Sequence, residues 1–342
     1  MTTGLPFDDI RALFKIMPKP DDEAAALARA HESHLTKPPG ALGKLEVIAE
    51  WMSAWQGQHP PKAERTVVAV FAGNHGVVAQ GVAAYPQAVT KQMVANFQAG
   101  GAAVNQICKT FDLGLKVFEL ALELPTADIT QEAALSEQEC AATFAYGMEA
   151  IAGGCDLLCV GEMGIGNTTI AAALCHALFG GQPEDWVGPG TGVDSAGIKR
   201  KAEAVRKAIA FHKSHLDDPL EVLRRVGGRE LSAMAGAIMA ARMERVPVLL
   251  DGYVASAAAA VLYVADSTAL DHCMAAHCSA EPAHRALLKK IGKEPILDLG
   301  MRLGEASGAA MAAAIVTPDD RTSRPMTTVF APVTATKACP AA

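Results

Sequence analysis

Residues 155–169 read CDLLCVGEMGIGNTT, a short apolar run followed at once by three glycines and two threonines. A strand that enters such a turn and continues into a helix presents backbone amides and a helix N-terminus to an anion. The spacing resembles a nucleotide-triphosphate loop, but Asn167 stands where that loop has lysine. Gly164 and Gly166 begin a dinucleotide turn, yet Thr169 replaces its third glycine. The stretch therefore predicts a site for a monophosphate or ribose, or else only a tight strand-to-helix turn.

Further apolar runs of strand length occur along the chain, separated by long alanine-rich segments of helical character. Runs that are apolar on both faces are typical of parallel strands covered by helices. Several of them end in glycine or an acidic residue, and ligands of open α/β sheets bind at the carboxyl ends of the strands. The sequence thus predicts an α/β fold with its site at one edge of a parallel sheet; the runs are 66–73, 115–122, 155–162, 246–253 and 294–301.

The two ends of the chain differ from this central pattern. Residues 1–60 read as helices joined by a Pro/Gly loop, with Asp21 as the N-cap of one of them. We expect a small helical domain over 1–60, an α/β domain over 61–317 and an irregular tail over 318–342. The tail expectation rests on four prolines, which forbid a long helix there: Pro318, Pro325, Pro332 and Pro340. The C-terminal segment is a candidate to complete the small domain.

Composition narrows the functional class. The 342 residues are 50% hydrophobic with a formal net charge of −7, and no dense Lys/Arg run is present, so we expect no nucleic-acid partner. No uninterrupted apolar stretch has membrane-spanning length, and the N-terminus lacks the pattern of a secretory signal. The eight cysteines lie mostly in apolar segments, which is typical of reduced, buried thiols in a cytoplasmic protein.

Two other segments have both a structural and a functional interpretation. The glycines of 188–192 precede Asp194 and a helix carrying Lys201, which is either a capped helix with a solvated basic face or a second phosphate-binding arm. Residues 271–284 are rich in His and Cys but lack standard zinc spacing, so we favour a core strand followed by a site loop with Ser279 and Glu281 at its tip.

Single residues in two further turns carry the same ambiguity. His75, after the first strand, is more often a residue that fixes a loop by hydrogen bonding than a catalyst. Glu305 lies between Gly304 and small residues at the start of an apolar helix. It either projects into a cleft or simply complements the helix dipole.

Taken in order, the motifs resemble those of the nicotinate-nucleotide:dimethylbenzimidazole phosphoribosyltransferases. The resemblance covers residues 30–315, and it rests on the motifs as a set. They are LTKPPGALGKLE (35–46), the segment 71–107, GEMGIGNTT (161–169), GPGTGVDSAGIKRK (188–201), LDGYVASAAA (250–259), SAEPAHRALL (279–288) and LGMRLGEASGAA (299–310). It implies a Rossmann-like parallel sheet with helices on both faces, a smaller helical domain and a homodimer.

The resemblance also implies a reaction and its residues. The phosphoribosyl group of nicotinate mononucleotide is transferred to 5,6-dimethylbenzimidazole, giving α-ribazole 5′-phosphate and nicotinate in cobalamin nucleotide-loop assembly. Glu305 matches the family's general base, and no metal or cofactor is required. The residues implied for phosphate and ribose are Glu162, Gly164, Gly166, Asn167, Thr168, Gly190, Lys201, Asp251 and Ser279. Those implied for the azole are Tyr85, Pro86, Gln92, Met93, Met163 and Leu303.

The sequence departs from the family pattern in the azole segment, where Tyr85–Pro86 stands in place of a Ser–Pro pair and Met93 in place of a glutamine. The preferred azole is therefore left open. Two other classes compete with the transferase. A dehydrogenase would need the complete dinucleotide fingerprint, and a non-catalytic azole- or nucleotide-binding protein would keep the glycine loops and could dispense with Glu305.

Overall fold

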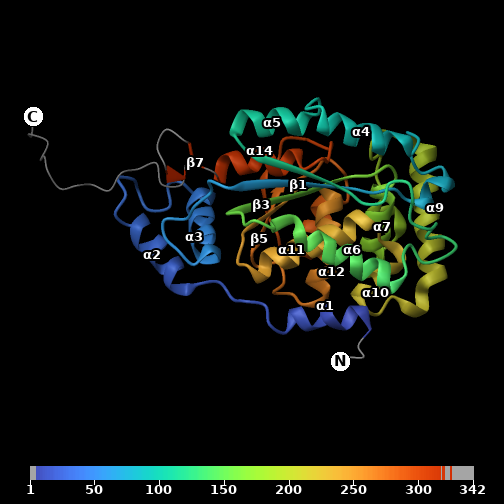
Figure 1. Cartoon of the computed structure of the whole chain (residues 1–342), viewed down its shortest axis with the longest axis horizontal. Coiled ribbons are helices and arrows are strands. Elements are labelled where there is room, and N and C mark those ends of the chain that lie inside the picture. Colours follow the sequence, from blue (N-terminus) through green and yellow to red (C-terminus); the bar gives the residue numbers. More distant parts are fainter. Residues whose placement is uncertain (1–4, 317, 320–323, 326–342) are drawn as a thin grey trace, which may run out of the picture.

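The computed structural model describes residues 5–316, 318–319 and 324–325. Its centre is a six-stranded, fully parallel sheet in the order β2-β1-β3-β4-β5-β6 (Figure 1). The strands are β1 (Thr66–Ala72), β2 (Gly114–Glu119), β3 (Leu157–Met163), β4 (Val248–Leu250), β5 (Cys273–His277) and β6 (Pro295–Leu297). The predicted α/β class is confirmed, and the His/Cys-rich stretch supplies strand β5.

Helices cover both faces of this sheet. One face carries α4 (Ala88–Gln98), α5 (Ala103–Phe111) and α14 (Ser307–Val316), and the other carries α6 (Glu137–Met148), α7 (Asn167–Phe179), α11 (Arg229–Met243) and α12 (Tyr253–Ala265) (Figure 1). The remaining helices are α1 (Pro6–Phe14), α2 (Asp22–Glu32), α3 (Lys44–Gln56), α8 (Pro183–Trp186), α9 (Ser195–His212), α10 (Pro219–Val226) and α13 (His284–Lys290), with short 3₁₀ turns η1 (Gly76–Gln80), η2 (Glu149–Ile151) and η3 (Lys213–His215).

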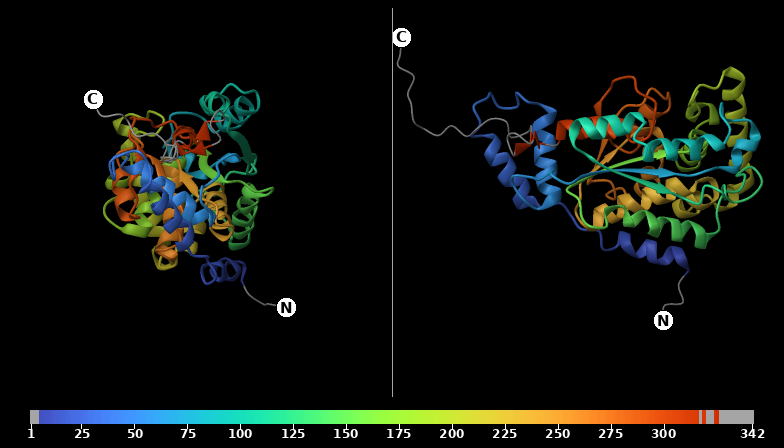
Figure 2. Two further views of the ribbon diagram at one scale, coloured as in Figure 1. Left: turned by 90° about the vertical axis from the view of Figure 1, so that its left-hand side faces the viewer. Right: turned by 45° about the horizontal axis from the view of Figure 1, so that its top comes forward.

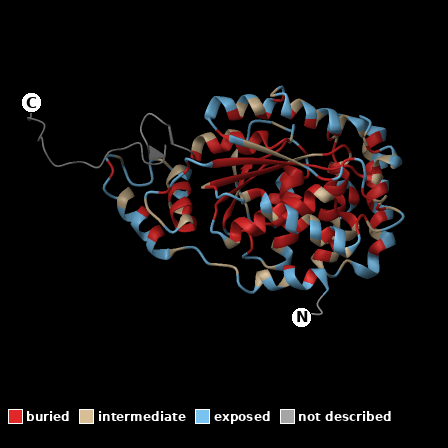
Figure 3. Ribbon diagram, viewed as in Figure 1, coloured by how far each residue is buried: buried red, intermediate tan, exposed pale blue. Residues whose placement is uncertain are grey.

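Alternate side chains of the central strands enter two different cores. In β1, Ala69 and Phe71 belong to the core under α7, α11 and α12, whereas Val68 and Val70 belong to the core under α14. Every residue of β1 is buried, and Figure 3 shows the central strands of the sheet in red. Burial on both faces explains why the strands read as continuous apolar runs rather than as alternating ones.

Helices α6 and α11 approach closely through a pair of glycines. A Cβ on Gly147 would overlap the carbonyl oxygen of Ala233, and a Cβ on Gly236 would overlap that of Phe144. At these two positions even the methyl group of an alanine would not fit, so the glycines allow the close spacing of the two helices. This agrees with the interpretation of the alanine-rich segments as closely packed helices.

The first 60 residues form three helices that do not all lie together. Helices α2 and α3 pack on each other beyond the amino ends of the strands, and α1 packs on α6 (Figures 1 and 2). Asp21 caps α2 as predicted, since its side chain accepts a hydrogen bond from the Ala24 amide at 2.8 Å. In the predicted tail, Pro318–Asp319 pairs antiparallel with Arg324–Pro325; the rest of that prediction lies outside the described residues.

The strand order places a topological switch at the carboxyl ends of β1 and β3. The chain goes from β1 outward to β2 on one side, and then from β3 onward through the other strands on the opposite side. The loops that follow β1 and β3 therefore diverge, which is where α/β sheets form their ligand crevice. Within the described residues, no helix is both long and apolar enough to cross a membrane.

Candidate active site

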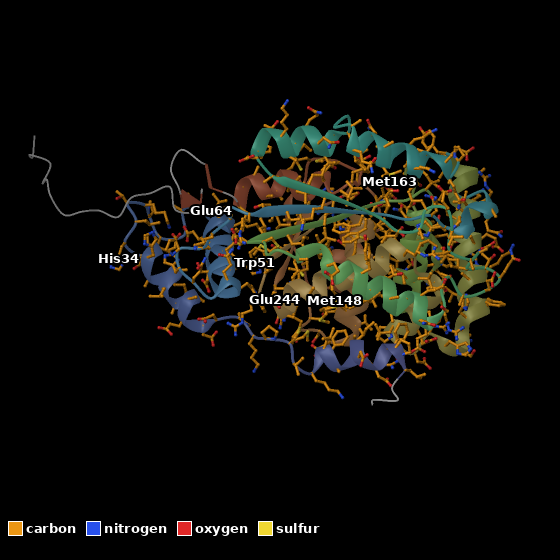
Figure 4. All side chains as sticks on the ribbon, in the orientation of Figure 1. His34, Trp51, Glu64, Met148, Met163 and Glu244 are labelled. Atoms are coloured by element: carbon orange, nitrogen blue, oxygen red, sulfur yellow. The ribbon has the colours of Figure 1, made fainter. Side chains whose placement is uncertain are left out.

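A cleft lies at the carboxyl ends of β3, β4, β5 and β6. The space between its walls, about 580 Å³, includes open solvent, so the cleft is open at one side. Met163, at the end of β3, is labelled in Figure 4, and Glu64 lies at the opposite end of the sheet. The lining residues are Glu162, Met163, Gly164, Ile165, Asn167, Thr168, Gly190, Thr191, Gly252, Tyr253, Val254, His277, Ser279, Glu281, Arg302, Leu303 and Gly304.

Lys201 forms the basic end of the cleft wall together with the first turn of α7. Its ammonium group donates hydrogen bonds to Thr168 Oγ1 at 3.0 Å and to the Gly188 carbonyl at 2.9 Å. The side chain is only 2% exposed, so it does not belong to a solvated basic face. Burial lowers the pKa of Lys201 to about 8, although Glu281 opposes that shift. The group is a buried cation at neutral pH, next to a helix N-terminus that itself favours anions.

Glu281 and Arg302 hold the second glycine cluster against this wall. Glu281 accepts a hydrogen bond from the Gly190 amide at 2.8 Å, and Arg302 donates one to the Gly190 carbonyl at 2.6 Å. Gly190 has φ +55°, and a Cβ there would lie 2.8 Å from Lys201 Nζ. A glycine is thus required for the loop to reach the lysine.

Three carboxyl groups lie close together next to the cleft, and Glu162 is the one that lines it. Glu162 is near the end of β3, Asp251 follows β4, and Glu305 precedes α14. Asp251 is held in place because it accepts a hydrogen bond from the Ala309 amide at 2.9 Å and lies 3.5 Å from His277 Nε2. Glu162 accepts a hydrogen bond from the Asn167 side chain. Burial raises the pKa of Glu162 well above its usual range, and Asp251 and Glu230 act in the same direction.

The turn that carries Glu305 has an unusual backbone. Gly304, Glu305 and Ala306 have φ of +79°, +61° and +56°, and the last two are rare for residues with a side chain. The Glu305 amide donates to the carbonyl of Glu162 at 3.0 Å, which ties the turn to β3. Gly161 makes this approach possible, since a Cβ there would lie 2.5 Å from the Ala306 Cα. Backbone strain of this kind tends to occur at functional sites.

Glu305 has the character of an acid–base group. Burial raises the pKa of Glu305 to about 7, and the negative charge of Asp251 contributes. The residue is 5% exposed, and its carboxyl group forms no hydrogen bond with any side chain or amide of the described residues. Glu305 itself is not among the residues that line the cleft, but it directly follows Gly304, which is. A carboxyl group that is unengaged, next to the cleft and poised near neutral pH is suited to remove a proton from a bound molecule.

The histidines of the His/Cys-rich stretch each have a partner of their own. His272 Nε2 lies 2.9 Å from the Ile238 carbonyl, and His284 Nε2 lies 2.9 Å from Ser256 Oγ. His284 Nδ1 accepts a hydrogen bond from the Ser279 amide, which positions the loop after β5. Burial lowers the pKa of both His272 and His284 to about 3. Among the described residues, no group of three or more His, Cys, Asp or Glu side chains is arranged to hold a metal ion.

Residues 17–330 match the family model described as phosphoribosyltransferase. The nicotinate-nucleotide–dimethylbenzimidazole phosphoribosyltransferase of Rhizobium etli (strain CIAT 652) is 65% identical over 314 residues, which are 92% of this chain and 93% of that protein. The protein of the same name from Brucella anthropi is 63% identical over the same shares. This chain belongs to the nicotinate-nucleotide–dimethylbenzimidazole phosphoribosyltransferase family.

Solved structures of the phosphoribosyltransferase family share the fold. The crystal structure of CobT from Thermus thermophilus is 43% identical, with a TM-score of 0.80 over 85% of this chain and 93% of that one. A second structure, of the nicotinate-nucleotide–dimethylbenzimidazole phosphoribosyltransferase from the same organism, is 42% identical with a TM-score of 0.79, over 86% of this chain and 95% of that one. The resemblance seen in the motifs is therefore confirmed.

Eight of the sixteen residues that the sequence suggested for this phosphoribosyltransferase line the cleft. Those that line it are Glu162, Met163, Gly164, Asn167, Thr168, Gly190, Ser279 and Leu303. Four more are not among its lining residues but adjoin one that is: Lys201 through its hydrogen bond to Thr168, and Asp251, Gly166 and Glu305 as chain neighbours of Gly252, Asn167 and Gly304. The azole segment lies elsewhere: Tyr85 is exposed, Pro86 is exposed just before α4, Gln92 lines a separate groove beside α4, and Met93 packs on the core under α14.

Sequence reasoning missed several residues of the cleft. Arg302, Tyr253 and Thr191 line it but were not singled out, and His277 was considered only as a metal-capable group. Arg302 lies three residues before Glu305 in a glycine-rich turn, and this position was an available signal. His277 could be assigned to the cleft only once the fold placed its Nε2 3.5 Å from Asp251, a contact that the sequence does not show.

Proposed function

We propose that this chain transfers the phosphoribosyl group of nicotinate mononucleotide to dimethylbenzimidazole, with Glu305 as the general base. The products are α-ribazole 5′-phosphate and nicotinate. Family membership supports the reaction. The observation that carries the role of Glu305 is its unengaged carboxyl group, whose pKa is raised to about 7 at the edge of the cleft.

The chemistry needs one proton acceptor and accurate placement. The ring nitrogen of nicotinate is cationic while it is bonded to C1′ of the ribose, so nicotinate leaves with a neutral nitrogen and requires no acid. The attacking nitrogen of the benzimidazole forms the new bond to C1′. The second nitrogen of the benzimidazole then loses its proton, and we propose that the Glu305 carboxylate accepts it. Such a transfer contributes about 10²–10⁴-fold to the rate.

The nucleotide phosphate is proposed to bind at the basic wall, which consists of Lys201 and the first turn of α7. Lys201 supplies a cation, and the first turn of α7 with Thr168 supplies backbone and hydroxyl donors. Glu162, held by Asn167, lies between this wall and Glu305, which fits a place beside the ribose. Gly164, Gly166, Gly190, Asp251 and Ser279 complete the proposed nucleotide site.

The azole substrate is proposed to bind between Met163 and Leu303. Both side chains line the cleft, and Leu303 is 53% exposed, so an apolar ring could cover it. Tyr85, Pro86, Gln92 and Met93 remain proposed azole residues on the strength of the resemblance. Their position outside the cleft would require α4 and the turn before it to close over the ring.

We further propose that the protein works as a cytoplasmic homodimer. All seven free cysteines among the described residues are buried, which suits a reducing compartment. The homodimer rests on the family resemblance. Light scattering coupled to gel filtration would give twice the chain mass of 35.6 kDa if the proposal is correct.

Glu305→Gln tests the proposed role of the general base. The amide keeps the shape of the side chain but cannot take up the azole proton, so kcat should fall by about two to four orders of magnitude. KM for both substrates should change far less, because the lost interaction forms mainly in the transition state. Release of nicotinate, followed by chromatography, measures both constants.

The pH profile adds a second readout to this experiment. Because Glu305 must be ionised to act, the parent's kcat should fall on the acid side of about pH 7, and this limb should vanish in the variant. Glu294→Gln, in the exposed loop before β6, is the matched control and should behave like the parent. A Glu305→Gln enzyme with parental kcat would transfer the role to Glu162. A parent that releases no nicotinate would favour the non-catalytic binding protein.

A further inference from the structure

A buried histidine–glutamate pair lies directly beneath the Gly164 turn. His75 follows β1, and Glu230 is in the first turn of α11. His75 Nε2 lies 2.5 Å from Glu230 Oε1, within hydrogen-bond distance, and both side chains are 0% exposed. Neither residue lines the cleft. The mechanism proposed above assigns no task to this pair.

Three glycines make room for the pair. A Cβ on Gly73 would lie 2.5 Å from Glu230 Oε2, and one on Gly228 would lie 2.5 Å from His75 Cε1. A Cβ on Gly164 would lie 3.0 Å from Glu230 Oε1 and 3.2 Å from His75 Nε2. The backbone of the nucleotide loop therefore rests on the paired side chains themselves. Moving either side chain would release the turn.

The pair is a costly arrangement for stability alone. His75 Nδ1 and Glu230 Oε2 are buried and find no hydrogen-bond partner among the described residues. Taking a carboxylate out of water carries a large desolvation cost, and a well-packed apolar pair of similar volume is often at least as stable. Unsatisfied buried polar atoms of this kind call for an explanation outside stability.

The same histidine connects the nucleotide loop to the azole segment. Its backbone carbonyl accepts a hydrogen bond from the Gln87 side chain, which precedes α4. Thr90, in the first turn of α4, accepts a hydrogen bond from the Ile165 amide at 3.2 Å. The turn of the nucleotide site and the start of α4 are therefore fixed to each other at two points around His75.

We propose that His75 and Glu230 are positioning residues for phosphoribosyl transfer, acting through Gly164. They hold the turn after β3 so that the nucleotide bound there and the azole beside α4 meet in line at C1′. This inference rests on the proposed function. A small misplacement of reacting groups can cost about 10²-fold in rate, so removal of the pair should lower kcat much more than it raises either KM.

A graded series of variants tests the pair. Glu230→Leu keeps the volume but removes the acceptor, and kcat should fall about 10- to 100-fold. Glu230→Gln retains an acceptor oxygen for His75 and should keep more of the rate. His212→Leu is the matched control, because it removes another fully buried histidine hydrogen bond, to the Ile129 carbonyl, at the far end of α9. It should lower the melting temperature and leave kcat and KM unchanged.

The outcomes separate positioning from ordinary stability. A lowered kcat in the Glu230 series, graded as above and absent in His212→Leu, supports the inference. Parental kcat in folded Glu230→Leu overturns it, as does an equal loss in His212→Leu. If Glu230→Leu yields no folded protein, Glu230→Gln decides: reduced kcat supports the role and parental kcat overturns it. Absence of nicotinate release by the parent would instead refute the proposed function.

Discussion

At the scale of the residue, the site depends on two ionisable groups, Glu305 and Lys201, whose surroundings shift their pKa values toward neutral pH. Burial makes the Glu305 carboxyl group a weaker acid and the Lys201 ammonium group a stronger one. Both groups therefore change charge near neutral pH. The carboxyl group can take up a proton during the reaction, while the ammonium group keeps its charge for the phosphate up to about pH 8.

Glu305 should reduce the stability of the folded chain above neutral pH. Its pKa is 4.5 in an ordinary setting and about 7 in the fold, so stability is fully retained below pH 4.5 and is lost as the pH rises through 7. Glu305→Gln removes this dependence. The melting temperature of the variant, minus that of the parent, should increase from pH 5 to pH 8. A constant difference would show that the fold does not raise this pKa.

Lys201 should matter for the nucleotide and hardly at all for the azole. A charge-assisted hydrogen bond contributes about 1.5–3 kcal/mol, so Lys201→Met should weaken binding of nicotinate mononucleotide by that amount. Binding to the parent should also weaken above pH 8, where the free lysine loses its charge. The nucleoside without phosphate is the control in calorimetry. Equal losses for nucleotide and nucleoside would show that Lys201 does not contact the phosphate.

At the scale of the element, the strands and the cleft edge could be predicted from the sequence, but the contacts behind the cleft could not. Residues 155–169 indicated a strand, a turn and a helix because their signals are local. The pairing of His75 with Glu230 joins residues 155 positions apart, and only the folded sheet brings them together. The positive φ of Glu305 is equally invisible, since the motif contains a non-glycine residue where glycine would be expected.

The close crossing of α6 and α11 gives an element-scale prediction. In Gly236→Ala, the methyl group gains about 1 kcal/mol of helix propensity but overlaps the Phe144 carbonyl, a backbone atom that cannot turn aside. The helices must separate, and the free energy of unfolding should fall by about 1–3 kcal/mol. Urea denaturation measures the change. Gly114→Ala, on the exposed edge strand β2, is the control, and a parental midpoint for Gly236→Ala would mean that the helices separate without cost.

At the scale of the whole molecule, the cleft and the small helices occupy opposite ends of the sheet. Helices α2 and α3 lie beyond the amino ends of the strands, whereas every element of the cleft lies at their carboxyl ends (Figure 1). Trp55 of α3 packs edge-on against His272 and lies 4.3 Å beneath the Arg242 guanidinium, so this helix is joined to the sheet through a buried cluster. Helices α2 and α3 thus cover the amino end of the sheet, opposite the cleft.

The C-terminal tail gives the last prediction. Among the described residues, both apolar cores extend no further than Val316 at the end of α14, and the residues of the cleft end at Gly304, just before Glu305. Residues 318–342 carry four prolines and pair only in the short ladder of Pro318–Asp319 with Arg324–Pro325 as far as the structure describes them. A chain that ends at Thr317 should therefore keep its melting temperature, its oligomeric mass and its kcat. Loss of folding or dissociation of the proposed dimer would instead make the tail part of the core, and the family match that continues to residue 330 would then have a structural reason.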